Sequence, residues 1–221
     1  MAIIEPPAQE IRHPGKSKKY SPSLRLWHWA NLVVISGSLI TVLLNSTIFD
    51  NNFNAKLIQG SLSKNGVSAN DEQAYQVAHT LSDKIWDIHV YFGYALAALL
   101  LFRLILEFLQ VADQKFIRNL NAAYQQYFNI KKQRETALHE LTVKLIYLFF
   151  YLLLVIMVVT GLLLAFKHEL NIQKSISHSI KEVHGFCMCL ILAFIVVHLA
   201  GVFLAERKDG KGIVSDMING G

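Results

Sequence analysis

The chain has 221 residues, of which 53% are hydrophobic and 17% are charged, with a formal net charge of +5. Soluble domains carry about 25% charged residues, so this composition argues against an ordinary soluble protein and predicts an integral membrane protein. The positive charge gives no reason to infer nucleic acid binding, because a basic face beside anionic membrane lipid accounts for it.

Four segments are long and apolar enough to cross a membrane, which takes about 20 mostly apolar residues in a helix. They cover residues 24–44, 85–109, 143–166 and 183–205. Together they predict one all-α membrane domain over residues 1–221, an integral membrane four-helix bundle.

The polar segment before the first span carries Pro6, Pro7, Pro14 and a lysine cluster, which is not typical of a cleavable signal peptide. We therefore expect the first span to remain as an anchor. The N-terminal arm, the connection after the second span and the C-terminal tail hold thirteen lysines and arginines, whereas the other two connections hold six. Since cytoplasmic loops are richer in these residues, both termini are predicted to be cytoplasmic.

Four histidines lie inside the apolar segments, namely His28, His89, His184 and His198. Ionisable side chains in a membrane are costly and usually functional. In the predicted orientation, His28 and His198 lie near the cytoplasmic side, and His89 and His184 lie near the outer side. Fourteen residues separate His184 from His198, roughly 21 Å along one helix face. The sequence therefore predicts the pairs His28/His198 and His89/His184 at two depths.

A histidine pair in each layer suits haem iron, because the porphyrin supplies four ligands and the protein adds two. Zinc needs three or four protein ligands at one point, which neither layer obviously offers. Cys187 and Cys189 are spaced C-x-C rather than C-x-x-C-H, so covalent haem attachment is not predicted. We interpret both as small buried apolar residues. Two non-covalent b-type haems per chain are therefore expected between the helices of the bundle.

Two arginines are candidates to bind haem propionates. Arg103 lies fourteen residues after His89 and is expected in the cytoplasmic layer on roughly the same helix face, where it could pair with a propionate. Arg103 could instead form a salt bridge with Glu107, or its side chain could extend to the membrane interface. Neither arrangement excludes a contact with a propionate. Arg25, one turn before His28, is the second candidate. An ordinary position at the membrane interface explains Arg25 better than it explains Arg103.

Three stretches and the C-terminal tail match a known pattern. They are Arg25-Leu-Trp-His28-Trp29, Trp86-Asp-Ile-His89-Val-Tyr-Phe-Gly93-Tyr, His184-Gly-Phe followed by His198, and the tail from Gly212 to Gly221. With these stretches the chain resembles the bacterial four-helix cytochrome b561 group, together with the b-type cytochrome subunit of nickel-iron hydrogenases. The resemblance covers essentially the whole chain.

The resemblance implies a dihaem cytochrome of the bacterial inner membrane that moves single electrons between the quinone pool and a redox partner in a respiratory chain. The first, second and fourth spans would supply the axial histidines, and the third span contains none. Each histidine is expected to coordinate as neutral imidazole while its other ring nitrogen donates to a carbonyl or carboxylate. No catalytic side chain is predicted, and whether the protein is an enzyme stays open.

Residues 45–84 form a long connection for which no structure of its own is expected. This loop covers the outer haem, docks a partner or is a tolerated insertion. His79 within it is interpreted as a solvated or packing residue.

A quinone site needs groups that exchange protons, and two clusters are candidates. They are His139, Glu140 and Lys144 on the cytoplasmic side, and His168, Glu169 and His178 outside.

Three functions stay open at this point. The first is an anchor subunit that passes electrons from a hydrogenase or another dehydrogenase to quinone. The second is a self-contained quinol-linked oxidoreductase that acts on a small oxidant or a soluble cytochrome c. The third, weaker alternative is a haem-free protein that uses its histidines as a proton relay. Homodimer formation is also left open.

Overall fold

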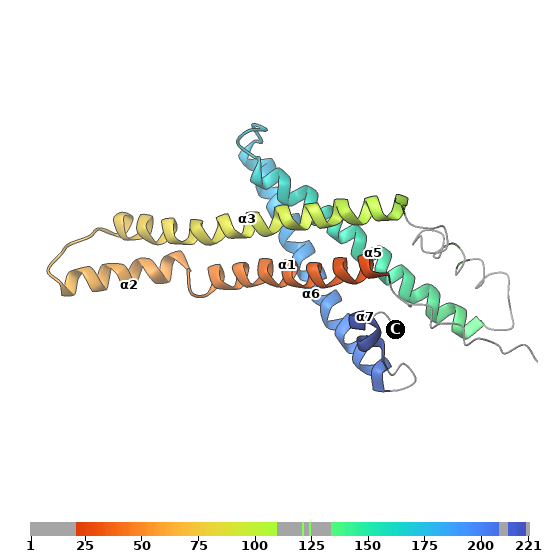
Figure 1. The fold of residues 1–221 in the computed structure, drawn as a ribbon. Helices are drawn as coiled ribbons and strands as arrows, with labels where there is room; N and C mark the ends of the chain where they lie inside the picture. The colour runs from red at the N-terminus through yellow and green to blue at the C-terminus, as the bar shows by residue number, and fades with distance from the viewer. Residues whose placement is uncertain (1–20, 110–120, 122–123, 125–133, 208–211, 220–221) are drawn as a thin grey trace, which may run out of the picture. The chain divides into compact units, whose positions relative to one another are not determined.

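The computed structural model describes residues 21–109, 121, 124, 134–207 and 212–219. These residues form helices joined by turns, and no strand occurs among them. The helices are α1 (Pro22–Ser46), α2 (Asn51–Lys64), α3 (Asp71–Leu109), α5 (Arg134–Ala165), α6 (Lys174–Arg207) and α7 (Ile213–Asn219) (Figure 1). The prediction of an all-α protein is confirmed.

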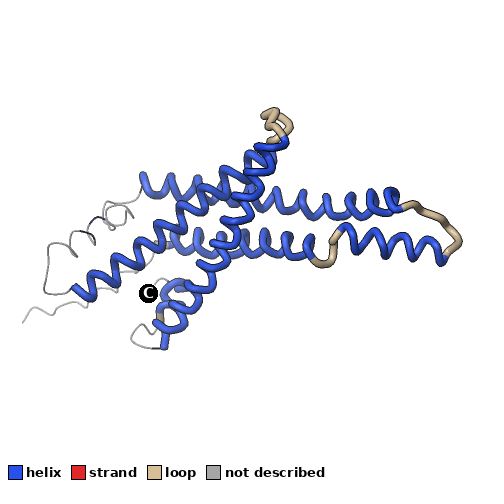
Figure 2. Tube along the Cα trace, turned by 180° about the vertical axis from the view of Figure 1, so that it is seen from behind, coloured by secondary structure: helices blue, strands red, loops and turns tan. Residues whose placement is uncertain are grey.

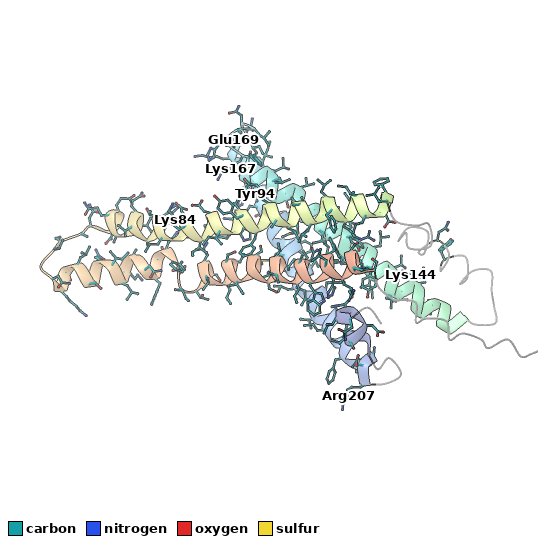
Figure 3. The ribbon with its side chains drawn as sticks, in the orientation of Figure 1. Lys84, Tyr94, Lys144, Lys167, Glu169 and Arg207 are labelled. Atoms are coloured by element: carbon teal, nitrogen blue, oxygen red, sulfur yellow. The ribbon has the colours of Figure 1, made fainter. Side chains whose placement is uncertain are left out.

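Helices α1, α3, α5 and α6 are long and apolar enough to cross a membrane. Lys144 in α5 and Lys167 in the turn after α5 border the apolar residues 145–166, and both lysines are labelled in Figure 3. Large apolar side chains such as Leu43, Leu101 and Phe186 are exposed on these helices. A helix that is apolar all round suits a lipid environment, where such exposure has no hydrophobic cost.

The contacts divide the chain into two compact units, residues 1–29 with 196–221 and residues 30–195. In the first unit, the start of α1 contacts the end of α6 and the short helix α7. In the second unit, α5 and α6 pack through a small core of Leu153, Cys187 and Ile191. The prediction that Cys187 is a buried apolar residue is confirmed, whereas Cys189 is exposed.

Helices α1 and α3 approach closely in the second unit because Gly37 has no side chain. A Cβ atom at position 37 would collide with the ring of Phe92. Small residues allow membrane helices to come together in this way, and the ring of Phe92 fills the space above the glycine. The contact helps to fix the depth of α3, which carries His89, against α1.

The expectation that residues 45–84 lack structure of their own is wrong. Residues 51–64 form α2, and α3 begins at Asp71, well before the predicted span. Helix α2 lies beside the first part of α3 in both views (Figures 1 and 2). The face of α3 that is buried there consists of small residues one turn apart, Ala74, Ala78 and Ser82, which lets the two helices approach closely.

Local signals define both ends of this helical hairpin. The Asp50 carboxylate accepts the backbone N–H of Phe53 at 2.8 Å and caps α2. Gly66, with a φ of 73°, ends the helix in a conformation that favours glycine. Asn70 and Gln73 then exchange reciprocal hydrogen bonds of 2.8 and 3.1 Å, a capping box at the start of α3.

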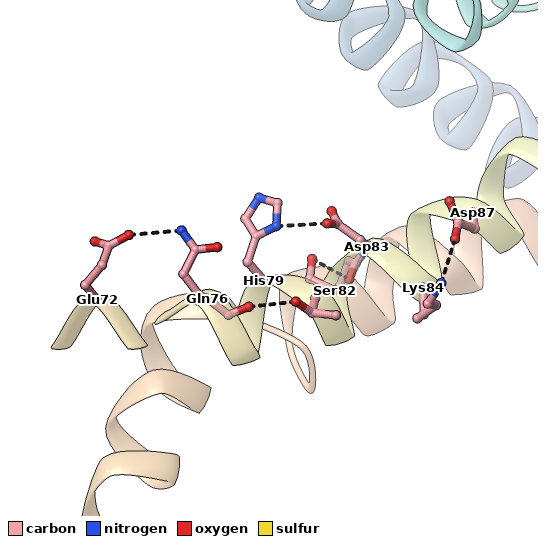
Figure 4. A network of polar contacts seen from close by, with 9 residues as sticks. Glu72, Gln76, His79, Ser82, Asp83, Lys84 and Asp87 are labelled. Atoms are coloured by element: carbon pink, nitrogen blue, oxygen red, sulfur yellow. Dashed lines mark hydrogen bonds and ion pairs between the residues drawn. The ribbon is translucent and has the colours of Figure 1, made fainter. Parts of the chain in front are cut away.

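Polar contacts continue along the exposed side of α3 (Figure 4). His79 pairs with Asp83 at 2.9 Å, and Lys84 pairs with Asp87 at 3.6 Å. Exposed pairs of this kind within one helix stabilise it only slightly. His79 is therefore a solvated residue paired within its own helix, one of the two roles expected for it.

Close packing of α2 on Ala78 gives a test of the hairpin. We expect Ala78→Leu to destabilise the packing by about 1–3 kcal/mol, because the larger side chain has no room between the helices. Amide hydrogen exchange in α2 should accelerate accordingly. Val77→Leu, at a neighbouring position that is half exposed, is the control. Equal exchange rates in the two variants would show that α2 does not pack on this face.

Candidate functional site

The first unit brings His28 of α1 together with His198 of α6. The ring centroids are 6.3 Å apart, and the ring planes meet at 56°. The Trp29 ring contacts His28 edge to face at a centroid distance of 5.3 Å. Both histidines are half-buried, so a predicted pair does come together here.

The C-terminal tail folds back against α1 beside His28. Arg25 donates from Nη1 to the carbonyl of Ile218 at 2.5 Å, and the Trp29 indole donates to the carbonyl of Met217 at 3.2 Å. The Glu206 carboxylate accepts the backbone N–H groups of Gly212 and Val214 at the start of α7. Helix α7 is therefore held at both ends next to this histidine pair.

The second unit brings His89 of α3 together with His184 of α6. Their ring centroids are 6.4 Å apart, and the planes meet at 78°. The Trp86 ring contacts His89 edge to face at 5.3 Å, much as Trp29 contacts His28. Both histidines are half-buried, and this is the second predicted pair.

Each histidine of the second pair is hydrogen-bonded through Nδ1 to a threonine. Thr41 Oγ1 lies 2.9 Å from Nδ1 of His89, and Thr160 Oγ1 lies 2.8 Å from Nδ1 of His184. The hydroxyl of Ser38 is a more distant neighbour of His89, at 3.4 Å. The expected partner was a carbonyl or carboxylate, and the structure has a hydroxyl instead. Sequence reasoning missed both threonines.

Helix α5 carries no histidine in its apolar part, yet it contributes to this site. Besides Thr160, it places Gly161 against the ring of His184. A Cβ atom at position 161 would just touch the ring, 3.4 Å from its Cε1, so a side chain longer than that of alanine would have little room beside the imidazole. The hydrogen bond and the glycine together determine where the His184 ring can lie.

The spacing within each pair suits a metal ion between the rings. Two imidazoles bound to one ion from opposite sides have ring centroids about 6 to 6.5 Å apart, because a metal to imidazole nitrogen bond is about 2 Å long. The measured separations of 6.3 and 6.4 Å agree with this. Since Nδ1 of His89 and of His184 is engaged by a threonine, Nε2 is the nitrogen left for coordination. The residues present therefore fit an iron that takes two axial imidazoles.

Arg103 lies in a buried polar cluster between α3 and α5. Its Nη2 pairs with the Glu107 carboxylate at 3.1 Å, and its Nε donates to the Tyr151 hydroxyl at 3.1 Å. The predicted salt bridge with Glu107 is therefore present. Nη1 of Arg103 and Nε of Arg25 are buried and have no hydrogen-bond partner among the described residues. Both guanidinium groups thus keep a donor for an anionic group.

Of the two clusters that are candidates for a quinone site, the structure describes the outer one more fully than the cytoplasmic one. The side chains of His139 and Glu140 lie outside the described residues. At the other end of α5, Lys167 and Glu169 lie together in the turn to α6 (Figure 3). His178 forms an exposed ion pair with Glu182 at 3.2 Å.

Comparison with known proteins identifies the family. The family model described as prokaryotic cytochrome b561 matches residues 19–220. Comparison with curated proteins finds no match, and comparison with solved structures finds none. The matched family carries b-type haem, and four helices of the chain are suited to cross a membrane. The chain is a multi-pass membrane b-type cytochrome of electron transfer and belongs to the prokaryotic cytochrome b561 family.

Proposed function

We propose that the protein binds two b-type haems and moves single electrons between the membrane quinone pool and a redox partner. One haem is held by His28 and His198, and the other by His89 and His184. The observation that carries the proposal is the spacing of the two pairs, 6.3 and 6.4 Å between ring centroids. When bound, haem iron takes up and releases one electron.

The histidines determine which chemistry the sites support. The two imidazoles at each site would hold the haem iron, and a haem held by two histidines would supply electron transfer rather than oxygen binding. The aromatic rings of Trp29 and Trp86 contact one histidine of each pair and limit the rotation of these imidazoles. Such sites suit electron transfer rather than catalysis on a bound substrate.

Arg25 and Arg103 are the proposed partners of haem propionates. Each keeps a buried donor without a hydrogen-bond partner among the described residues, and charge-assisted bonds to carboxylates would satisfy these donors. Arg25 also holds the C-terminal tail through the carbonyl of Ile218. A propionate at Arg25 would therefore link the haem to the tail.

The location and topology follow from the sequence pattern. We place the protein in the bacterial cytoplasmic membrane, as one domain with both termini on the cytoplasmic side, because the basic residues are concentrated in the termini and in the connection after the second span. In this topology the α2–α3 hairpin lies on the outer side.

The hairpin favours a second candidate function, the anchor subunit of a hydrogenase or another dehydrogenase. Phe53 and Leu57 of α2 and Val77 and Leu81 of α3 are all about half exposed or more. Exposed apolar side chains on a polar hairpin are a feature of surfaces that bind partners. A hydrogenase or dehydrogenase encoded beside this chain would favour the anchor function.

Single histidine variants test the ligand pairs. His184→Ala and His89→Ala should each lose the same one of the two haems, because either substitution leaves that haem with a single histidine ligand. His198→Ala and His28→Ala should each lose the other haem. The measurement is haem per chain with the reduced-minus-oxidised spectrum. His178→Ala, an exposed histidine of α6, should keep all the haem. Different spectra within a pair, or loss of both haems from a single variant, would contradict the pairing.

Electron exchange with quinol and quinone tests the proposal that the protein reacts with the membrane quinone pool. A short-chain ubiquinol or menaquinol added to the oxidised protein in lipid nanodiscs should produce the absorbance of reduced b-type haem. Electron exchange with quinone requires this reaction in at least one direction, so the oxidised short-chain quinone should in turn reoxidise the dithionite-reduced protein. Failure of both reactions with both quinone types would exclude the quinone pool.

A further inference from the structure

We propose that Thr41 and Thr160 fix the proton of His89 and His184 on Nδ1 and lower the reduction potential of the haem that this pair holds. The inference rests on the proposed function, since it requires haem at this pair. It assigns a positioning role to two helices, α1 and α5, at a site whose histidines come from α3 and α6.

The direction of these hydrogen bonds follows from the second contact of each hydroxyl. Thr41 Oγ1 lies 2.6 Å from the carbonyl oxygen of Ser38, and Thr160 Oγ1 lies 2.6 Å from that of Ile156. A carbonyl can only accept, so the single hydroxyl proton must point at it. The hydroxyl oxygen is then an acceptor toward the imidazole, and Nδ1 must be the donor.

The same tautomer therefore results at both histidines. Each Nδ1 carries the proton, and each Nε2 keeps the lone pair that binds iron. Water is scarce inside a membrane, so the threonine is the acceptor that this N–H requires. Because each hydroxyl also donates to a carbonyl, it is polarised and becomes a better acceptor than an isolated hydroxyl.

An acceptor on Nδ1–H makes the imidazole a stronger electron donor to the metal. A stronger donor stabilises the ferric state more than the ferrous state, so the potential of this haem falls. His28 of the other pair differs from His89 and His184, because its Nδ1 is buried and has no hydrogen-bond partner among the described residues. The threonines therefore contribute to a difference between the two haem potentials.

Valine variants of the holoprotein test the inference. Valine has nearly the shape of threonine but cannot accept a hydrogen bond. In a redox titration, Thr160→Val and Thr41→Val should each raise the midpoint of one haem transition and leave the other unchanged. The expected shift corresponds to at most about a tenfold change in the reduction equilibrium, or about 59 mV for one electron. Thr160→Ser, which keeps the hydroxyl, should restore the original midpoint.

Thr142→Val is the matched control. Thr142 also lies in α5 and donates to the carbonyl one turn earlier, that of Leu138, at 2.8 Å, so Thr142→Val removes the same kind of hydrogen bond to the backbone without removing a partner of a histidine. An unchanged midpoint in Thr160→Val with all haem retained would overturn the inference, as would an equal shift in Thr142→Val. If Thr160→Val loses half the haem, Thr160→Ser must retain it at the original midpoint, and its failure to do so would also overturn the inference.

Haem content of the unaltered protein and of His184→Ala is measured first. If His184→Ala loses no haem, the ligand assignment fails, and that result does not depend on any threonine variant. If His184→Ala loses half the haem and the valine variants leave the midpoint unchanged, only the role of the threonines fails.

Discussion

A histidine within a membrane helix needs an acceptor for the ring nitrogen that does not bind its ligand, because hydrocarbon offers no water in its place. At His89 and His184 this acceptor is a threonine from a neighbouring helix. Each hydrogen bond ties the rotation of an imidazole to the packing of two helices. The distance between the two rings therefore depends on the mutual positions of α1, α3, α5 and α6 within the second unit. Gly37 contributes because it lets Phe92 lie where any larger residue would displace its ring, and Gly161 leaves room beside the ring of His184.

The four long helices could be predicted from the sequence because length and hydropathy decide whether a helix can span a membrane. The α2–α3 hairpin was missed, although its signals are local. Asp50 precedes α2, Gly66 follows it, and Asn70 with Gln73 forms a capping box. The connection was expected to be unstructured because it is too polar to span a membrane. Helix-capping residues can nevertheless be recognised in a polar segment, because they do not depend on hydropathy.

The histidine pairs could be anticipated because ionisable residues are rare in apolar segments and topology gives their depth. The threonines could not. In membrane helices a threonine hydroxyl commonly donates to the carbonyl one turn earlier, as Thr142 does, so Thr160 carries no distinguishing mark in the sequence. Which threonine faces a histidine depends on the rotation of each helix, and tertiary packing sets that rotation. The bond from Arg25 to Ile218 has the same origin, since it requires the tail to fold back onto α1.

The most direct test of the central claim is the haem content of the purified protein, measured by a pyridine haemochrome assay with a reduced-minus-oxidised spectrum. The two histidine pairs predict two haems per chain, both of b type and both low-spin. A protein purified from haem-replete cells that carries no haem would contradict the account and return the four histidines to a proton relay. A single haem per chain would show that only one of the two pairs binds iron.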